Sequence, residues 1–128
     1  MITLDSSIWV AALHESDSQH EKAIDTFDSI DISKVSIFDF TYIEVMNVLK
    51  RKASITICEN FLELLHRMNA NILISSSHQI ALTNEMFFED LKDLSFSDCM
   101  HMATAKIFNA DLLTFDKNLQ KAWKKLKK

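Results

Sequence analysis

Four acidic residues occupy positions from which they could act together: Asp5, Glu44, Asp98 and Asp116. Asp5 ends the short apolar run ITLD, and Asp116 directly follows the run LLTF. Carboxylates packed together repel one another, and a bound divalent cation relieves that repulsion. Oxygen-only ligands favour Mg²⁺ or Mn²⁺ over zinc. If the four acids converge, they indicate a metal site that could activate water for attack on a phosphodiester.

Each of these acids also has an ordinary structural interpretation. Asp5 and Asp116 could cap the helices that follow them. Asp98 could be the third-position acid of a capping box that begins at Ser95, and Glu44 could be a solvated helix residue. The chain has 18 acidic residues, so chance placement is easy. What favours function is that all four are expected at one edge of a sheet.

Hydrophobic periodicity predicts short strands that alternate with helices. The expected strands are 2–5, 34–38, 71–75 and 112–115. The expected helices are 7–15, 18–30, 40–52, 55–69, 77–91, 97–109 and 117–126, with Leu91 on the apolar side of the fifth. This alternation favours a parallel sheet, in which ligands gather at the C-terminal ends of the strands. Because the chain lacks glycine, we expect Asn109 to end its helix in the left-handed conformation.

Composition excludes several classes of protein. Without Gly or Pro, the chain can have neither a P-loop nor a dinucleotide-binding fingerprint. Its apolar runs are far shorter than the roughly 20 residues of a membrane span. The N-terminal MITLDSSIWVAAL has no basic segment typical of an export signal, so we expect a cytoplasmic protein that does not associate with membranes. The two cysteines are expected to be reduced and buried.

Charge is unevenly distributed along the chain. The net charge is −4, and six of the 14 basic residues are lysines within 117–128. Residues 1–116 therefore carry eight basic against 18 acidic residues. This pattern suits cation binding combined with a local contact to a polyanion. A solubilising last helix explains the lysines at least as well.

The remaining candidate side chains favour packing over chemistry. His101 lies three residues after Asp98, so a D-x-x-H metal pair is conceivable, but a packing histidine is the favoured interpretation. Trp9 and Phe115 are interpreted as core residues rather than as platforms for base stacking. No order of Ser, His and Asp typical of a hydrolase elbow is present.

Four blocks occur in a distinctive order: ITLDSSIWVAAL, FTYIEVMNVLKR, LSFSDCMHMATA and LLTFDKNL. Together they resemble the blocks of PIN-domain ribonucleases, in particular the VapC-type toxins of prokaryotic toxin–antitoxin pairs. The resemblance spans residues 5–118. It implies a single PIN-like domain over 1–128, with 117–128 as a lysine-rich last helix. The implied fold is an α/β three-layer sandwich, in which a parallel sheet of four to five strands has helices on both faces.

The resemblance also implies a function. It implies an endoribonuclease that depends on Mg²⁺ or Mn²⁺, cleaves RNA, forms a homodimer and is neutralised by a cognate antitoxin. Its catalytic and metal-binding positions correspond to Asp5, Glu44, Asp98 and Asp116. Supporting roles correspond to Ser6, Asn118 and Thr114, whose hydroxyl would orient the Asp116 carboxylate. Phosphate contacts would have to come from the lysine tail or from Lys50, Arg51 and Lys52.

Two other functions stay open at this point. The chain could be a catalytically silent PIN-like binding module that acts through a protein partner. A phosphoryl-accepting switch or phosphatase fits less well, because Ser7 stands where a D-x-D phosphatase has its second acid. The sequence also departs from its relatives, which usually have Gly near Asn109–Ala110. This difference affects a turn and leaves the four acids in place.

Overall fold

The computed structural model describes residues 1–89 and 93–127. The strands are β1 (Ile2–Leu4), β2 (Val35–Phe38), β3 (Ile72–Leu73) and β4 (Asp111–Leu113). The helices are α1 (Ser6–Leu13), α2 (His20–Ser29), α3 (Asp39–Lys52), α4 (Ile55–Arg67), α5 (Ser77–Phe88), α6 (Phe96–Phe108) and α7 (Lys117–Lys127). A short 3₁₀ helix, η1 (Ile32–Lys34), precedes β2. Leu91 and Lys128, which were expected in helices, lie outside the described residues.

The four strands form a parallel sheet in the order β3-β2-β1-β4, which confirms the predicted class. β1 is therefore central, with β2 on one side and β4 on the other. In the β1–β4 pair, Leu4 lies opposite Leu113. The residues that follow these two, Asp5 and Thr114, consequently emerge side by side at the C-terminal edge of the sheet.

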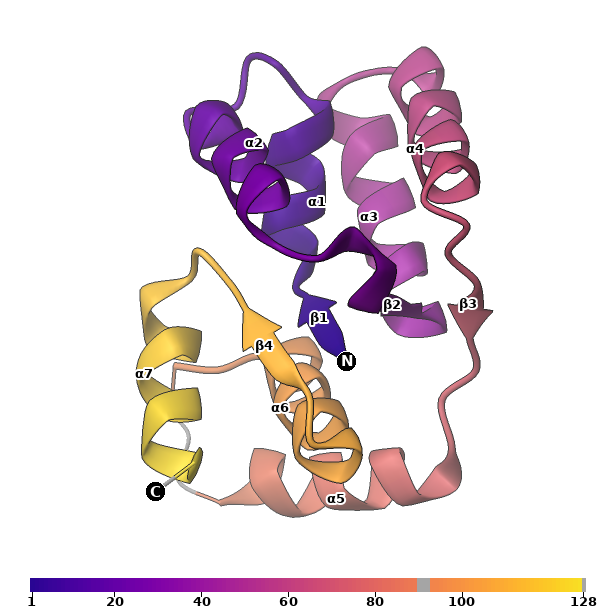
Figure 1. Ribbon diagram of the computed structural model, residues 1–128. Coiled ribbons are helices and arrows are strands. Elements are labelled where there is room, and N and C mark those ends of the chain that lie inside the picture. The colour runs from indigo at the N-terminus through magenta and orange to yellow at the C-terminus, as the bar shows by residue number, and fades with distance from the viewer. Residues whose placement is uncertain (90–92, 128) are drawn as a thin grey trace.

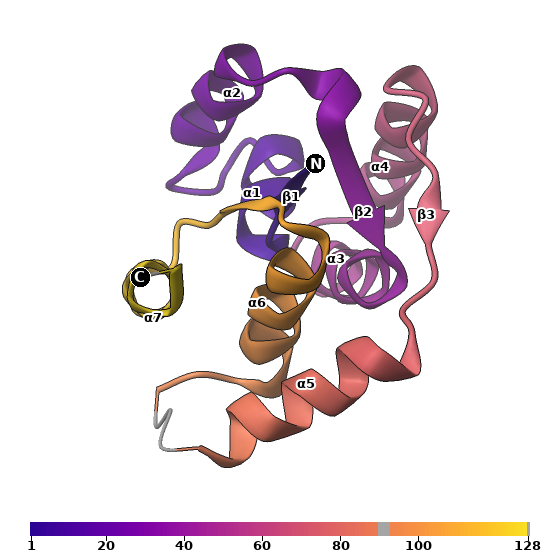
Figure 2. The ribbon, with the colours of Figure 1, turned by 60° about the horizontal axis from the view of Figure 1, so that its bottom comes forward.

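Helices cover both faces of the sheet, so the protein has three layers. α1 to α4 lie on one side of the strands and α5 to α7 on the other (Figure 1), and a second view shows α5 passing beneath α6 and the sheet (Figure 2). The core on the α1–α4 side includes Leu4, Ile8, Trp9, Ile37, Val45, Leu49 and Phe61. The core on the α5–α7 side includes Met86, Cys99, Met102, Ala103, Leu112, Leu119 and Trp123.

Trp9 anchors the first core. Its side chain is completely buried, and its ring lies 5.4 Å from that of Phe27 and 5.6 Å from that of Phe61. These centroid distances are typical of favourable aromatic pairs, which add stabilisation beyond the burial of apolar area. The expected core role of Trp9 is confirmed, and α1 is fixed against both α2 and α4.

Local signals define the ends of α6. Ser95 caps its N-terminus, and Asp98 completes a reciprocal capping box. At the other end Asn109 has φ 51° and ψ 46°, the left-handed conformation predicted for it. Residues 99–105 are all buried, because this helix is covered by neighbours on more than one side. Cys58 and Cys99 are buried and unpaired, as expected.

Within the described ranges, 1–89 and 93–127, no helix is both long and apolar enough to cross a bilayer.

Candidate active site

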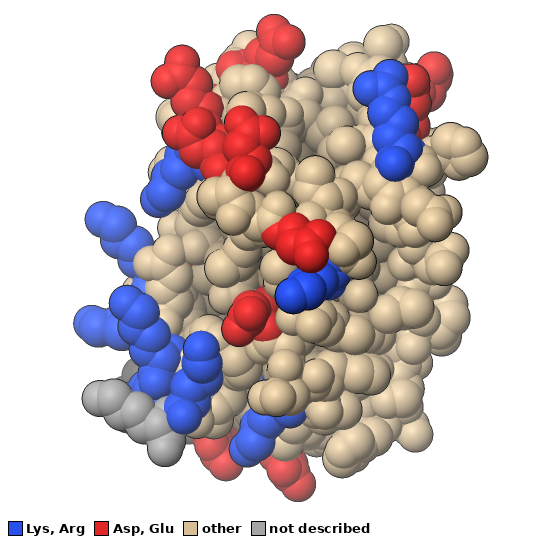
Figure 3. Space-filling model, viewed as in Figure 1, with Lys and Arg blue, Asp and Glu red and all other residues tan. Residues whose placement is uncertain are grey.

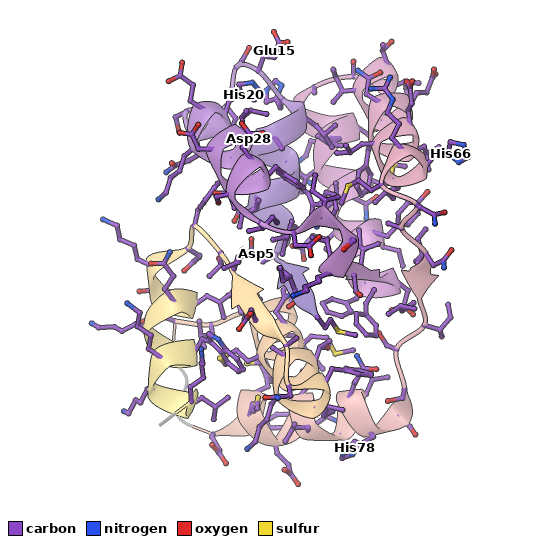
Figure 4. All side chains as sticks on the ribbon, in the orientation of Figure 1. Asp5, Glu15, His20, Asp28, His66 and His78 are labelled. Carbon is purple, nitrogen blue, oxygen red and sulfur yellow. The ribbon has the colours of Figure 1, made fainter. Side chains whose placement is uncertain are left out.

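Asp5 lies at the centre of the C-terminal edge of the sheet (Figure 4). It is the N-cap of α1, and its Oδ1 accepts hydrogen bonds from the backbone N–H of Ser7, at 2.9 Å, and from the Ser7 hydroxyl. Oδ2 accepts a hydrogen bond of 2.5 Å from the hydroxyl of Thr114. The residue is only 4% exposed. Three donors therefore stabilise a buried carboxylate, and the cap and the site residue are one and the same side chain.

Thr114 has a different partner from the one expected. Its hydroxyl donates to the Asp5 carboxylate and accepts a hydrogen bond of 3.0 Å from the backbone N–H of Asp116. The Asp116 carboxylate instead accepts a hydrogen bond from the N–H of Leu119 at 3.0 Å, in the first turn of α7. The expectation that Thr114 orients the Asp116 carboxylate is thus wrong. The strand register places Thr114 beside Asp5, while the Asp116 carboxylate caps the start of α7.

Glu44 connects α1 to α6. Its Oε1 accepts a hydrogen bond from the Ser6 hydroxyl, and its Oε2 accepts one of 2.6 Å from the Ser97 hydroxyl. Ser6 was expected to support the site, and the structure brings it to Glu44. Ser97 is a contact that the sequence reasoning missed. The only signal for it was a hydroxyl residue next to Asp98, which is common at helix starts and does not indicate a partner 53 residues away.

Asp98 shares its electrostatic environment with two of the other acids. Burial raises the pKa of its carboxyl group above the usual range, hydrogen bonds with Ser95 oppose that rise, and the charges of Asp116 and Asp5 add to it. Like charges act in this way only when they lie near one another. Asp98 is therefore a cap whose carboxyl group is also influenced by the charges of Asp5 and Asp116.

His101 forms part of the inner wall of this region. It is 2% exposed and packs edge-on against Phe40, with ring centroids 4.9 Å apart. Burial lowers its pKa, although the charges of Asp5, Glu44 and Asp98 act in the opposite direction. Its Nε2 is buried and has no hydrogen-bond partner. These features favour the packing interpretation, with a neutral ring at neutral pH.

Two other histidines lie far from this edge. Figure 4 shows His66 and His78 at the periphery of the molecule, projecting away from Asp5. Both are exposed.

The donor set suits a hard divalent cation in its chemistry. The acids offer oxygen ligands. The pKa of Asp98 is raised mainly by burial and further by the charges of Asp116 and Asp5, and a cation would relieve that repulsion. However, in residues 1–89 and 93–127 no three His, Cys, Asp or Glu side chains form a group that could hold a metal ion. The carboxylates are directed instead toward hydroxyl and backbone donors. The residue types therefore fit Mg²⁺ or Mn²⁺, whereas a complete coordination shell is not assembled.

Two grooves flank Glu44 and its serine partners. The first, which we call the Phe115 groove, measures about 390 Å³ and is lined by Ser6, Ser7, Gln19, Val48, Lys52 and Phe115, among others. The second, the Phe96 groove, measures about 680 Å³ and is lined by Phe40, Ile43, Glu44, Ile80, Phe96 and Met100, among others. The first presents hydroxyl, amide, ammonium and carboxylate groups, while the second is mainly hydrocarbon.

The remaining predicted residues lie on the surface. Lys50, Arg51 and Lys52 are exposed at the end of α3, about two turns beyond Glu44. Lys52 lines the Phe115 groove and Arg51 lines the Phe96 groove. Asn118 is exposed in the first turn of α7. Figure 3 shows lysine side chains gathered along α7 and acidic ones over α2 and the preceding loop.

The family of the chain follows from a sequence comparison. The model of the PIN domain matches residues 2–125, so the protein belongs to the PIN domain family. The resemblance of the four sequence blocks is thereby confirmed at the level of the family.

A solved structure shares this fold. Mycobacterium tuberculosis VapC20, described as a toxin that cleaves the sarcin–ricin loop, superimposes with a TM-score of 0.82 over 95% of each chain, at 16% sequence identity. At that identity the likeness establishes the fold. No curated protein shows significant sequence similarity to this chain.

Proposed function

We propose that this protein is an endoribonuclease that depends on Mg²⁺ or Mn²⁺ and acts as the toxin of a toxin–antitoxin pair. One observation carries the proposal: in a chain of the PIN family, the Asp98 carboxyl group lies in the field of Asp5 and Asp116 at the C-terminal edge of the sheet. Each of these acids can cap only its own helix, so capping does not explain why carboxylates from distant segments lie near one another. Their shared task is to hold a cation.

Asp5, Asp98 and Asp116, together with Glu44, would hold the metal ion. When bound, Mg²⁺ or Mn²⁺ supplies the Lewis acidity that phosphodiester hydrolysis requires. The surrounding hydroxyl groups set the positions of the acids. Thr114 and Ser7 fix the Asp5 carboxylate, and Ser6 and Ser97 fix that of Glu44 from two helices.

The proposed partners follow from the same assignment. The substrate is RNA, and the neutralising partner is a cognate antitoxin protein, in keeping with the likeness to a VapC toxin. We further propose that the protein is a cytoplasmic homodimer.

RNA cleavage by purified protein tests the enzymatic proposal. We expect cleavage of single-stranded RNA that requires Mn²⁺ or Mg²⁺ and is lost in Asp98→Asn. Asp111→Asn is the matched control, because this exposed residue begins β4, at the opposite edge of the sheet. Cleavage by Asp98→Asn at the wild-type rate would contradict the assignment of the site.

A second candidate, a catalytically silent PIN-like module, is favoured by one observation. The described side chains do not form a group of three ligands ready to hold a metal ion. A silent module binds no divalent cation specifically, and so gains no thermal stability from Mn²⁺. Titration calorimetry with Mn²⁺ separates the two, since the nuclease must show saturable binding that Asp98→Asn weakens.

A further inference from the structure

The Phe115 groove adjoins the acidic site through two serines. Ser6 and Ser7 both line it. The Ser6 hydroxyl donates to Glu44 and the Ser7 hydroxyl to Asp5. The side chains of Ser6 and Ser7 therefore stand between a molecule in this groove and the acids of the proposed active site.

Phe115 supplies an aromatic surface in this groove. It is partly buried and packs against the core on the α1–α4 side, which confirms part of its expected role. Its ring also lines the groove, and the ammonium group of Lys22 lies 4.8 Å from the ring centroid. A ring face that accepts a long, exposed lysine is accessible from solvent. Contacts of this kind are weak at exposed sites, so a stacking ligand can displace the lysine.

One cationic group lines the groove, and a second lies over its aromatic ring. Lys52 lines the groove from the end of α3, and the ammonium group of Lys22, in α2, lies over the Phe115 ring. One acid, Asp17, also lines the groove, but its Oδ1 accepts a hydrogen bond of 2.8 Å from the backbone N–H of Gln19. Aromatic and cationic groups together are the combination that single-stranded nucleic acids require, because bases stack on rings while phosphates contact lysines.

We propose that the Phe115 groove binds one nucleotide of a single-stranded RNA substrate. The base stacks on the ring of Phe115 in place of the Lys22 ammonium group, and Lys52 contacts a neighbouring phosphate. Stacking of this kind requires an unpaired base. The proposal rests on the proposed function for the identity of the ligand, but it concerns binding rather than cleavage.

Binding of RNA to the Asp98→Asn protein isolates this step from cleavage. The probe is a short single-stranded RNA of mixed sequence that carries 2-aminopurine, whose fluorescence is quenched on stacking. We expect Phe115→Leu to weaken binding about tenfold, within the fivefold to 150-fold range typical of one stacked base, and to remove most of the quenching. Phe115→Trp should bind as tightly as the parent or more tightly, because it retains an aromatic face.

Two matched variants locate the effect. Phe88→Leu removes a ring that is 82% exposed and lines neither groove, so binding should not change. Lys52→Gln should lower the slope of log affinity against log salt by about 0.7, the value for one phosphate contact on a single strand. Circular dichroism of Phe115→Leu confirms that the variant is folded.

Wild-type binding by Phe115→Leu, or loss of binding in Phe96→Leu alone, would overturn the proposal. If binding depends on Phe115 but the wild-type protein does not cleave RNA, the groove assignment stands and the nuclease fails. If the protein cleaves RNA and neither Phe115 variant changes binding, the nuclease stands and the groove assignment fails.

Discussion

Thr114 donates a 2.5 Å hydrogen bond to Oδ2 of Asp5 across the β1–β4 pair. The two residues are 109 positions apart in the sequence, and the strand register makes them neighbours. The hydroxyl also accepts the backbone N–H of Asp116. A single buried side chain thus holds the carboxylate of one proposed metal ligand, Asp5, and the backbone of another, Asp116.

Replacing Thr114 should therefore impair both stability and activity. Thr114→Val retains the shape of the side chain but removes the donor from a buried carboxylate, a change that costs about 1–3 kcal/mol. We expect a lower free energy of unfolding in urea and slower RNA cleavage. Thr114→Ser restores the hydroxyl and should recover most of both. If the valine variant equals the wild type in both assays, this hydrogen bond does not position the site.

Asp98→Asn and Asp5→Asn should both abolish cleavage, with different effects on stability. At Asp98 the amide oxygen can still accept the N–H of Ser95, so the capping box survives. Burial and the like charges of Asp116 and Asp5 raise the pKa of Asp98, so ionisation of this group weakens the fold as pH rises from 3.8 through the folded pKa. Asp98→Asn should thus be no less stable than the wild type at neutral pH.

Asp5→Asn is expected to cost stability. Oδ1 and Oδ2 of Asp5 both accept hydrogen bonds in the native protein, and an amide nitrogen can replace neither as an acceptor. Thermal unfolding of the two variants in parallel tests this difference. Equal melting temperatures would show that the donors around Asp5 do not stabilise it.

Mn²⁺ should raise the melting temperature of the wild-type protein. At a concentration 100-fold above the dissociation constant, the stabilisation would reach about 2.7 kcal/mol. The effect should diminish at acidic pH, because protons compete with the cation for carboxylates and the pKa of Asp98 is already raised. It should be much smaller in Asp98→Asn. The baseline is the melting temperature in Ca²⁺-free buffer that contains a chelator. An unchanged melting temperature in Mn²⁺ would support the silent module.

His101 should make the protein less stable in acid. Burial lowers the pKa of His101 in the folded protein, despite the nearby charges of Asp5, Glu44 and Asp98. Its contribution to stability is fully present above the unfolded-state pKa of 6.5 and is lost as pH falls toward the lower folded value. His101→Leu should thus reduce the dependence of melting temperature on pH between about pH 7 and pH 5. The exposed His66, changed to Gln, is the control and should leave the wild-type dependence unchanged.

The phosphate contacts can be located by salt dependence. In the Asp98→Asn background, changing residues 50–52 to glutamine should lower the slope of log RNA affinity against log salt by about 2, or about 0.7 for each cation. The matched variant carries the same change at Lys117, Lys121 and Lys124, which are exposed along α7. A larger effect in the α7 variant would show that the RNA follows this helix instead.

Local features of this protein could be determined from its sequence alone. The alternation of strands and helices, the capping box of Ser95 and Asp98, and the left-handed Asn109 depend on residues within a few positions of one another. The placement of Asp5 and Asp116 at one edge also followed, because parallel strands end on the same side. The predicted ends of the strands differed from the observed ends by a few residues. Asp5 and Thr114 each continue an apolar run in the sequence, but in the structure Asp5 caps a helix and Thr114 donates a hydrogen bond.

Only the tertiary structure decided which groups meet. Thr114 pairs with Asp5 because Leu4 and Leu113 are in register, which no local pattern specifies. Glu44 lies between Ser6 and Ser97 because α1, α3 and α6 converge at the edge of the sheet. Helix caps and periodicity are set by neighbours in the chain, whereas these contacts arise from the packing of helices and strands that are distant in sequence.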